Sequence, residues 1–93
     1  MLEIMLESSS WNSPEDFYHD LLAALGAPDW HGHNLDALWD SITGGGINEV
    51  NPPFVIRVVG ERRNSNCDEF LRRVQEMFVD ARAQNVDVEM VGL

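Results

Sequence analysis

The sequence reads WHGHNLDALWDSITGGG at residues 30–46, and this stretch gives the clearest indication of the fold of the whole chain. It predicts an exposed loop that leads into a short helix. Asn34 can cap the first turn of that helix through its side-chain oxygen, and Gly44 can adopt the left-handed conformation that ends a helix. An apolar stripe at helical spacing lies between them and consists of Leu35, Leu38 and Ile42.

A second face of the same predicted helix is acidic. Asp36 and Asp40 are four residues apart, Thr43 follows three residues later, and Trp39 lies at the edge of this face. Like charges at this spacing repel by about 0.2–0.5 kcal/mol. The helix dipole favours an anion in the first turn, where Asp36 lies, but disfavours one toward the end, where Asp40 lies. Because the loop before the helix also carries Trp30, His31 and His33, which are bulky for loop residues, we interpret this face as a surface for a cationic partner. A solvated helix face is the alternative.

The residues on either side predict five further elements. Ser13, Pro14 and the acid at Asp16 indicate the start of a helix that ends at Gly26. Asn66 with Glu69 three residues later indicates the start of the last helix, for which Asn85 can serve as the terminator. The expected strands are residues 2–6, 54–59 and 86–91.

Residues 54–59 are almost continuously apolar, which is typical of a central strand covered on both faces. The element order is therefore β-α-α-β-α-β. Strands separated by helical crossovers predict an α/β fold with a small three-stranded, mostly parallel sheet packed with helices.

The length of 93 residues suits one domain, residues 1–93. A single cysteine, Cys67, excludes an internal disulfide and fits a reducing compartment, and we expect it to be a core or semi-buried thiol. The N-terminus carries acid where a signal peptide needs base, and its apolar run is too short to span a bilayer. We therefore expect a soluble, cytoplasmic protein. The role of Trp11 is left open, as core cover or as a second contact.

The charge distribution is uneven. The net charge is −10, from 16 acids against six arginines, and residues 1–56 contain nine acids and no Lys or Arg. Such a surface repels nucleic acid and anionic membranes, so neither is expected as a partner. It attracts basic proteins and accelerates their encounter. Solubility alone is the other explanation of this acidity.

Residues 30–40, continued by Thr43 and Gly44, resemble the signature of the barstar family of bacterial ribonuclease inhibitors. That signature is an aromatic-rich loop followed by Gly-x-Asn-Leu-Asp-Ala-Leu-Trp-Asp. The resemblance extends to the order of elements and to residues 77–83 of the closing helix. It implies a barstar-like domain that is not an enzyme and needs no cofactor or metal. It further implies an intracellular inhibitor, an immunity protein or antitoxin, that is a monomer when free and forms a 1:1 complex with a basic ribonuclease or ribonuclease toxin.

The resemblance also implies which residues bind the partner. In the family, the aspartate that corresponds to Asp40 enters the pocket that holds the substrate phosphate, and the one that corresponds to Asp36 contacts the same basic rim. Trp30 replaces a tyrosine that packs on the catalytic histidine, and Asp80 replaces a peripheral glutamate. The implied contact set is Trp30, His31, Gly32, Asn34, Leu35, Asp36, Trp39, Asp40, Thr43, Gly44 and Asp80.

The sequence departs from the family pattern at three positions. His31 replaces an aromatic residue, His33 replaces an acid, and Gly45 replaces a tryptophan that packs on the enzyme. The partner is therefore expected to be a different ribonuclease from that of the family's prototype.

The sequence leaves three alternatives to inhibition. His31-x-His33 with Asp29 or Asp36 nearby could bind zinc. Asp36 and Asp40 form a carboxylate pair suited to hydrolysis, but an exposed helix lacks the desolvated cleft that catalysis needs. The third alternative is a barstar-fold interaction module that regulates a non-nuclease partner. A gene for a small basic nuclease beside this one would favour immunity over regulation.

Overall fold

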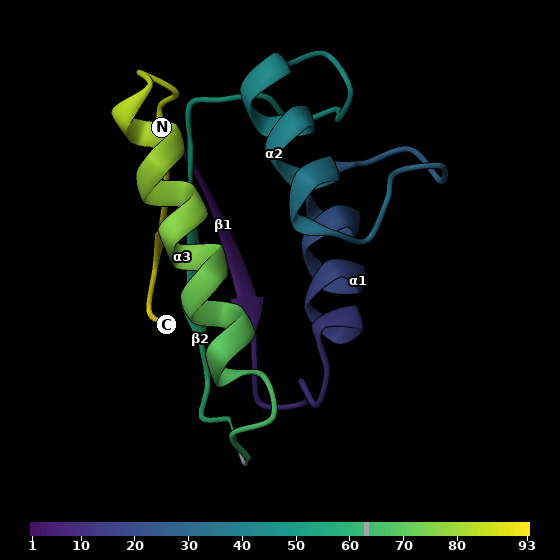
Figure 1. The fold of residues 1–93 in the computed structure, drawn as a ribbon, viewed down its shortest axis with the longest axis vertical. Helices are drawn as coiled ribbons and strands as arrows, with labels where there is room; N and C mark the ends of the chain where they lie inside the picture. The colour runs from purple at the N-terminus through teal and green to yellow at the C-terminus, as the bar shows by residue number, and fades with distance from the viewer. Residues whose placement is uncertain (63) are drawn as a thin grey trace.

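The computed structural model describes residues 1–62 and 64–93. Three strands and three helices follow in the predicted order (Figure 1): β1 (Leu2–Glu7), α1 (Pro14–Leu25), α2 (Leu35–Gly44), β2 (Phe54–Val59), α3 (Asp68–Ala83) and β3 (Val88–Val91). The predicted α/β fold with the order β-α-α-β-α-β is thereby confirmed. No helix of the described residues is long and apolar enough to cross a membrane.

The sheet is parallel throughout, with the strand order β1-β2-β3. Leu2 lies opposite Phe54, which lies opposite Val88 on its other side. The prediction that residues 54–59 form the central strand is therefore confirmed.

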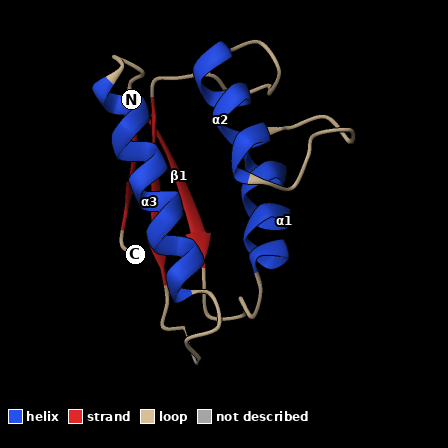
Figure 2. Cartoon of the chain, in the orientation of Figure 1, coloured by secondary structure: helices blue, strands red, loops and turns tan. Residues whose placement is uncertain are grey.

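The prediction that this central strand is covered on both faces is wrong. Phe54, Ile56 and Val58 are buried, whereas Arg57 on the opposite face is exposed and pairs with Glu3 of β1 at 3.2 Å. The strand order explains this, because right-handed crossovers that proceed in one direction across a sheet put every helix on the same face. In Figure 2 the helices accordingly lie on one side of the strands.

The core between the sheet and the helices is rich in aromatic side chains. The Phe17 ring packs edge-on against Trp11 at a centroid distance of 5.4 Å and against Phe70 at 5.5 Å. Trp11 is fully buried, and its Nε1–H donates to Asp20 Oδ2 at 2.7 Å, so this residue covers the core. Cys67 is buried as expected, and burial raises the pKa of its thiol.

The helix starts follow the predicted capping residues in two of three cases. Ser13 precedes α1, and the Asp16 carboxylate accepts the backbone N–H of Ser13 at 3.2 Å. Asn34 caps α2, since its Oδ1 accepts the Ala37 N–H at 2.7 Å. The third helix begins at Asp68, with Cys67 rather than Asn66 at its cap.

The chain also departs from prediction at one helix end and at the start of one strand. Gly26 and Asn85 have φ of +65° and +67°, as expected of helix terminators. Gly44, in contrast, is still helical, and Gly45 has the positive φ of +70°. The last strand begins at Val88, two residues later than predicted.

Candidate protein interface

The loop between α1 and α2 presents a large aromatic side chain to solvent. The His31 N–H donates to the Pro28 carbonyl at 3.0 Å, and this turn places Asp29 and Trp30 at its tip. The loop extends away from the body of the molecule (Figure 1), and 74% of the Trp30 surface is exposed. An indole held in water in this way is available to a partner.

His31, next along the loop, points inward. Its Nδ1 lies 2.7 Å from the Gly32 carbonyl oxygen, its Nε2 lies 2.9 Å from Ser41 Oγ on α2, and the residue is 5% exposed. The prediction that the His31 side chain belongs to the exposed loop surface is therefore wrong. Neighbouring residues of a turn diverge, so His31 fixes the loop to α2 while Trp30 faces solvent.

Ser41 and Asn48 complete this buried polar network, and neither was identified from the sequence. Asn48 Nδ2 donates to Ser41 Oγ at 3.1 Å, and Ser41 Oγ also lies 3.1 Å from the Leu38 carbonyl oxygen. Asn48 Oδ1 is buried without a hydrogen-bond partner among the described residues. The available signal was Ser41 itself, a polar residue three positions after Leu38 on the apolar stripe of α2.

His33 lies on the opposite side of the loop from this network. Its Nδ1 contacts Glu15 Oε1 of α1 at 2.5 Å, and its ring stacks on Tyr18 at 5.9 Å between centroids. Burial raises the pKa of the Tyr18 hydroxyl to about 12. His31 and His33 thus have separate partners, and within residues 1–62 and 64–93 no group of three or more potential ligands could hold a metal ion.

Two small contacts shape the entry into α2. A side chain at Gly32 would place its Cβ 2.9 Å from Asn34 Nδ2 and 3.1 Å from the Ala37 Cβ, so it would crowd the cap. Leu35 is partly buried and packs on the core, and Asn34 remains exposed while it caps. The lack of a side chain at Gly32 therefore leaves room for the cap.

The two faces of α2 are as the sequence predicts. Leu38 and Ile42 are fully buried, and Asp36 and Asp40 are both exposed. At the edge, Trp39 is partly buried against the core, and the Thr43 hydroxyl donates to the Trp39 carbonyl at 2.7 Å. Gly44, the last residue of the helix, is exposed and has open space around its Cα. The core contacts hold α2 in place, so its acidic face has a fixed orientation.

A hollow of about 370 Å³ borders the start of α2, and both Asp36 and Arg73 of α3 line it. Asp80 is exposed and lies seven residues after Arg73. Seven residues make about two turns of a helix, so both side chains project from the same side of α3.

The acids of this region differ from the other acids in their contacts. Nine acids elsewhere form ion pairs or accept hydrogen bonds: Glu3, Glu7, Glu15, Asp16, Asp20, Asp68, Glu69, Glu76 and Glu89. Among the described residues, no ion pair or side-chain hydrogen bond engages the remaining acids: Asp29, Asp36, Asp40, Glu49, Glu61, Asp80 and Asp87. Of these, Asp36 and Asp40 lie on α2, Asp29 lies on the loop before it, and Asp87 lines a hollow at the end of α2.

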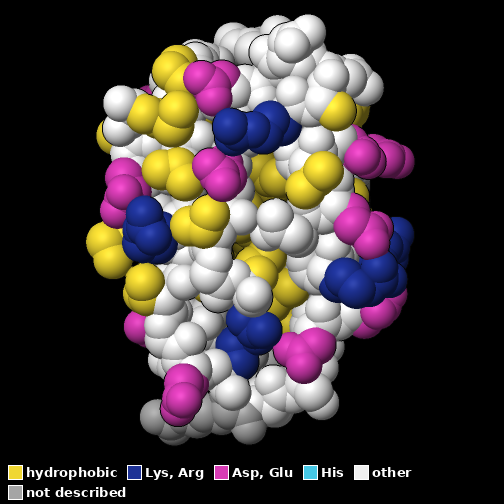
Figure 3. All heavy atoms as spheres, turned by 90° about the vertical axis from the view of Figure 1, so that its left-hand side faces the viewer, with side chains coloured by type: hydrophobic (Ala, Val, Ile, Leu, Met, Phe, Trp, Pro, Cys, Tyr) yellow, Lys and Arg dark blue, Asp and Glu magenta, His cyan; other side chains and the backbone are white. Residues whose placement is uncertain are grey.

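Figure 3 shows the opposite arrangement on the side of the molecule away from the α1–α2 loop. The Arg side chains in this view each lie beside Asp or Glu, with apolar side chains between them. The ion pair of Arg82 with Glu89, at 3.3 Å, is an example. Local arginines therefore neutralise many acids outside the α2 region, whereas the acids around α2 keep their charge available.

Two comparisons with known proteins bear on this surface. The family model described as Barstar (barnase inhibitor) matches residues 1–91. The chain is also 41% identical over 44 residues to a Bacillus subtilis (strain 168) protein named "Putative ribonuclease inhibitor YrdF". That match covers 47% of this chain and 48% of the relative, so it spans about half the length of each.

Proposed function

The chain belongs to the barstar family, and from this premise we propose that it inhibits a ribonuclease by covering the active site with the α1–α2 loop and α2. Family membership and the name of the relative support the inhibitor role. The observation that carries the choice of surface is the gathering of unpaired acids around α2, beside the exposed Trp30.

Ribonucleases bind the RNA phosphate through cationic side chains, and a carboxylate on a fixed helix can take the place of that phosphate. Hydrogen bonds between arginine and a carboxylate are charge-assisted and are strongest where water is excluded. In this proposal Asp40 enters the phosphate pocket, Asp36 contacts its rim, and Asp80 adds an outer contact from α3. Trp30 packs on the aromatic or histidine side chains of the catalytic cleft.

Hydrogen bonds within the free protein already support this surface. Asn34 caps α2, and the bonds of His31 to Gly32 and Ser41 fix the loop before it. Binding therefore orders few side chains, and preorganisation of this kind preserves affinity. His31 contributes to the interface through this support, since its side chain is buried.

The biological role that fits is that of an immunity protein or antitoxin that forms a 1:1 complex with a ribonuclease toxin inside the cell that makes it. His33 and Gly45 replace an acid and a tryptophan of the family pattern, so the proposed partner is a ribonuclease of another lineage than the prototype's. Immunity requires rapid capture, and an acidic surface accelerates the encounter with a basic enzyme.

The experiment that tests this function begins with the ribonuclease that co-purifies with the tagged protein from its native host. Inhibition of RNA cleavage is then titrated with the wild type, Asp40→Ala, Asp36→Ala and Asp80→Ala. We expect Asp40→Ala to weaken binding by about 2–5 kcal/mol, and the other two variants to cost less, because only Asp40 is fully desolvated in the phosphate pocket.

Glu61→Ala is the matched control, because Glu61 is an exposed acid without an ion pair among the described residues and lies beyond the end of β2. It should inhibit like the wild type. A mononucleotide bound in the ribonuclease active site should compete with the inhibitor. Equal losses for Asp36, Asp40 and Asp80 would refute the phosphate-mimic assignment, and the absence of any ribonuclease among the co-purified proteins would refute the function.

A further inference from the structure

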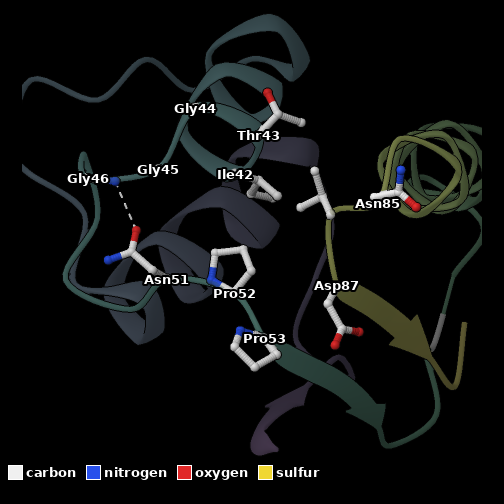
Figure 4. Close-up of a pocket in the computed structure, with 11 residues that line it drawn as sticks. Ile42, Thr43, Gly44, Gly45, Gly46, Asn51, Pro52, Pro53, Asn85 and Asp87 are labelled. Atoms are coloured by element: carbon white, nitrogen blue, oxygen red, sulfur yellow. Dashed lines mark hydrogen bonds between the residues drawn. The ribbon is translucent and has the colours of Figure 1, made fainter.

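A hollow of about 770 Å³ lies where α2 and α3 both end. Figure 4 shows it between Ile42–Gly46 at the end of α2 and the Asn85–Asp87 segment that follows α3, with Pro52 and Pro53 beside them. Its floor includes the apolar side chains of Ile42 and Pro52. The glycine edge carries no side chains, so the hollow is open to a group that arrives from outside.

The chemistry around this hollow is that of hydrogen-bond acceptors. The carbonyl groups of the last turn of a helix point beyond its end and carry partial negative charge. In α3 two of these groups have partners, because the Ala81 and Arg82 carbonyls accept the backbone N–H groups of Gln84, Asn85 and Val86. In α2 no hydrogen bond from outside the helix reaches the carbonyls of Ser41 to Gly44 among the described residues, and no basic residue lies in its last turn.

Asp87 adds a full negative charge to this edge. It lines the hollow, it is exposed, and none of the ion pairs among the described residues includes it. Asn51 lies across the opening, where its Oδ1 accepts the Gly46 N–H at 2.9 Å (Figure 4) and holds the glycine edge in place. The hollow therefore combines an apolar floor with an anionic rim.

We propose that this hollow receives an arginine or lysine side chain from a loop of the ribonuclease, an inference that rests on the proposed function. Such a side chain has an aliphatic stem that can cover Ile42 and Pro52 while its charged head reaches the rim. Thr43 and Gly44, which belong to the proposed contact set, form one wall, so the hollow extends the interface beyond Asp40. It offers a binding contact in the place of the tryptophan that Gly45 replaces.

The test uses capped arginine, N-acetyl-arginine N-methylamide, as the probe, and capped citrulline as its neutral analogue. Backbone amide resonances of the whole protein are followed by NMR during each titration. We expect capped arginine to shift Gly45, Gly46, Asn85 and Asp87 saturably, and capped citrulline to bind these sites about tenfold more weakly or not at all. Asp87→Asn should weaken the binding of capped arginine about fivefold, and the matched control Glu61→Gln should leave it unchanged.

The same variants are then assayed for ribonuclease inhibition, where Asp87→Asn should weaken the complex about fivefold and Glu61→Gln should not. Equal binding of both probes, or shifts spread over the whole acidic surface, would overturn the inference while leaving the proposed function intact. Specific binding of capped arginine by a protein that inhibits no ribonuclease would retain the cation site and reject the proposed function. An unchanged NMR spectrum outside the hollow verifies that Asp87→Asn is folded.

Discussion

Replacing Ser41 by alanine tests whether the buried network fixes the α1–α2 loop. The hydroxyl of Ser41 lies 2.9 Å from His31 Nε2, 3.1 Å from Asn48 Nδ2 and 3.1 Å from the Leu38 carbonyl oxygen. The Ser41 hydroxyl thus joins the His31 ring, the Asn48 amide and the backbone of α2. Alanine removes the shared atom and leaves two buried nitrogen atoms without their partner.

The expected cost follows from these two nitrogens. A buried polar group that loses its partner costs about 1–3 kcal/mol, and alanine returns up to about 0.5 kcal/mol through its higher helix propensity. Two such groups cost about 2–6 kcal/mol, so after this gain the free energy of unfolding should fall by about 1.5–6 kcal/mol. For a domain of this length, each kcal/mol lowers the Tm by roughly 4–8 °C.

Urea denaturation of the wild type and Ser41→Ala measures the loss directly. Thr43→Ala is the matched control, because its hydroxyl lies on the same helix but bonds only the Trp39 carbonyl, and it should change stability by no more than about 0.5 kcal/mol. Hydrogen exchange of residues 27–34 should also become faster in Ser41→Ala. If the two variants lose the same free energy, or if the loop keeps its protection, the network does not hold the loop.

Three further predictions concern titration, the core and association. The pKa of Tyr18 is raised to about 12, so tyrosinate absorbance in the folded protein should develop near pH 12. The stability that this group contributes is complete below about pH 10 and is lost as the pH rises through 12. An absorbance midpoint near pH 10 in the folded protein would contradict this prediction. Trp11→Phe should lower the free energy of unfolding by about 2–3 kcal/mol, because the hydrogen bond to Asp20 and part of a buried ring are lost. The control Trp30→Phe changes an exposed residue and should alter the free energy of unfolding by less than about 0.5 kcal/mol in the same urea titration. Raising the salt concentration from about 0.05 to 0.5 M should slow association with the ribonuclease about tenfold or more and change the dissociation rate far less. Stopped-flow kinetics measures both rates, and a larger effect of salt on the dissociation rate than on the association rate would reject electrostatic steering.

Local signals sufficed for the order of the elements and for most of their ends. The Ser13-Pro14 start, the Asn34 cap and the terminators Gly26 and Asn85 each act through the backbone of their own neighbourhood, so the sequence specifies them. Three consecutive glycines are different, because any of them can adopt a positive φ. Packing then decides which one ends the helix, and it is Gly45.

Features that depend on distant residues could not be predicted in this way. The direction of His31 depends on Ser41 and on Asn48, which comes from a connection that looked merely polar. The exposed face of β2 depends on the direction in which both crossovers traverse the sheet, although Arg57 within the apolar run was a signal. The hollow at the end of α2 joins three segments, 42–46, 51–53 and 85–87, and no local pattern connects them.

Asp40 lies on the acidic face of α2, and both the sequence and the structure indicate that its charge is uncompensated in the free protein. A pattern shows only that Asp40 lies four residues after Asp36 on a helix whose dipole does not favour it there. The structure adds that no ion pair among the described residues compensates Asp40, although arginines neutralise acids elsewhere in the molecule. If the acidity served solubility alone, there would be no reason for two unpaired acids to lie four residues apart on one capped helix, next to a loop with an exposed tryptophan. A cationic partner provides that reason, because the repulsion that the free protein retains around Asp40 becomes attraction in the complex.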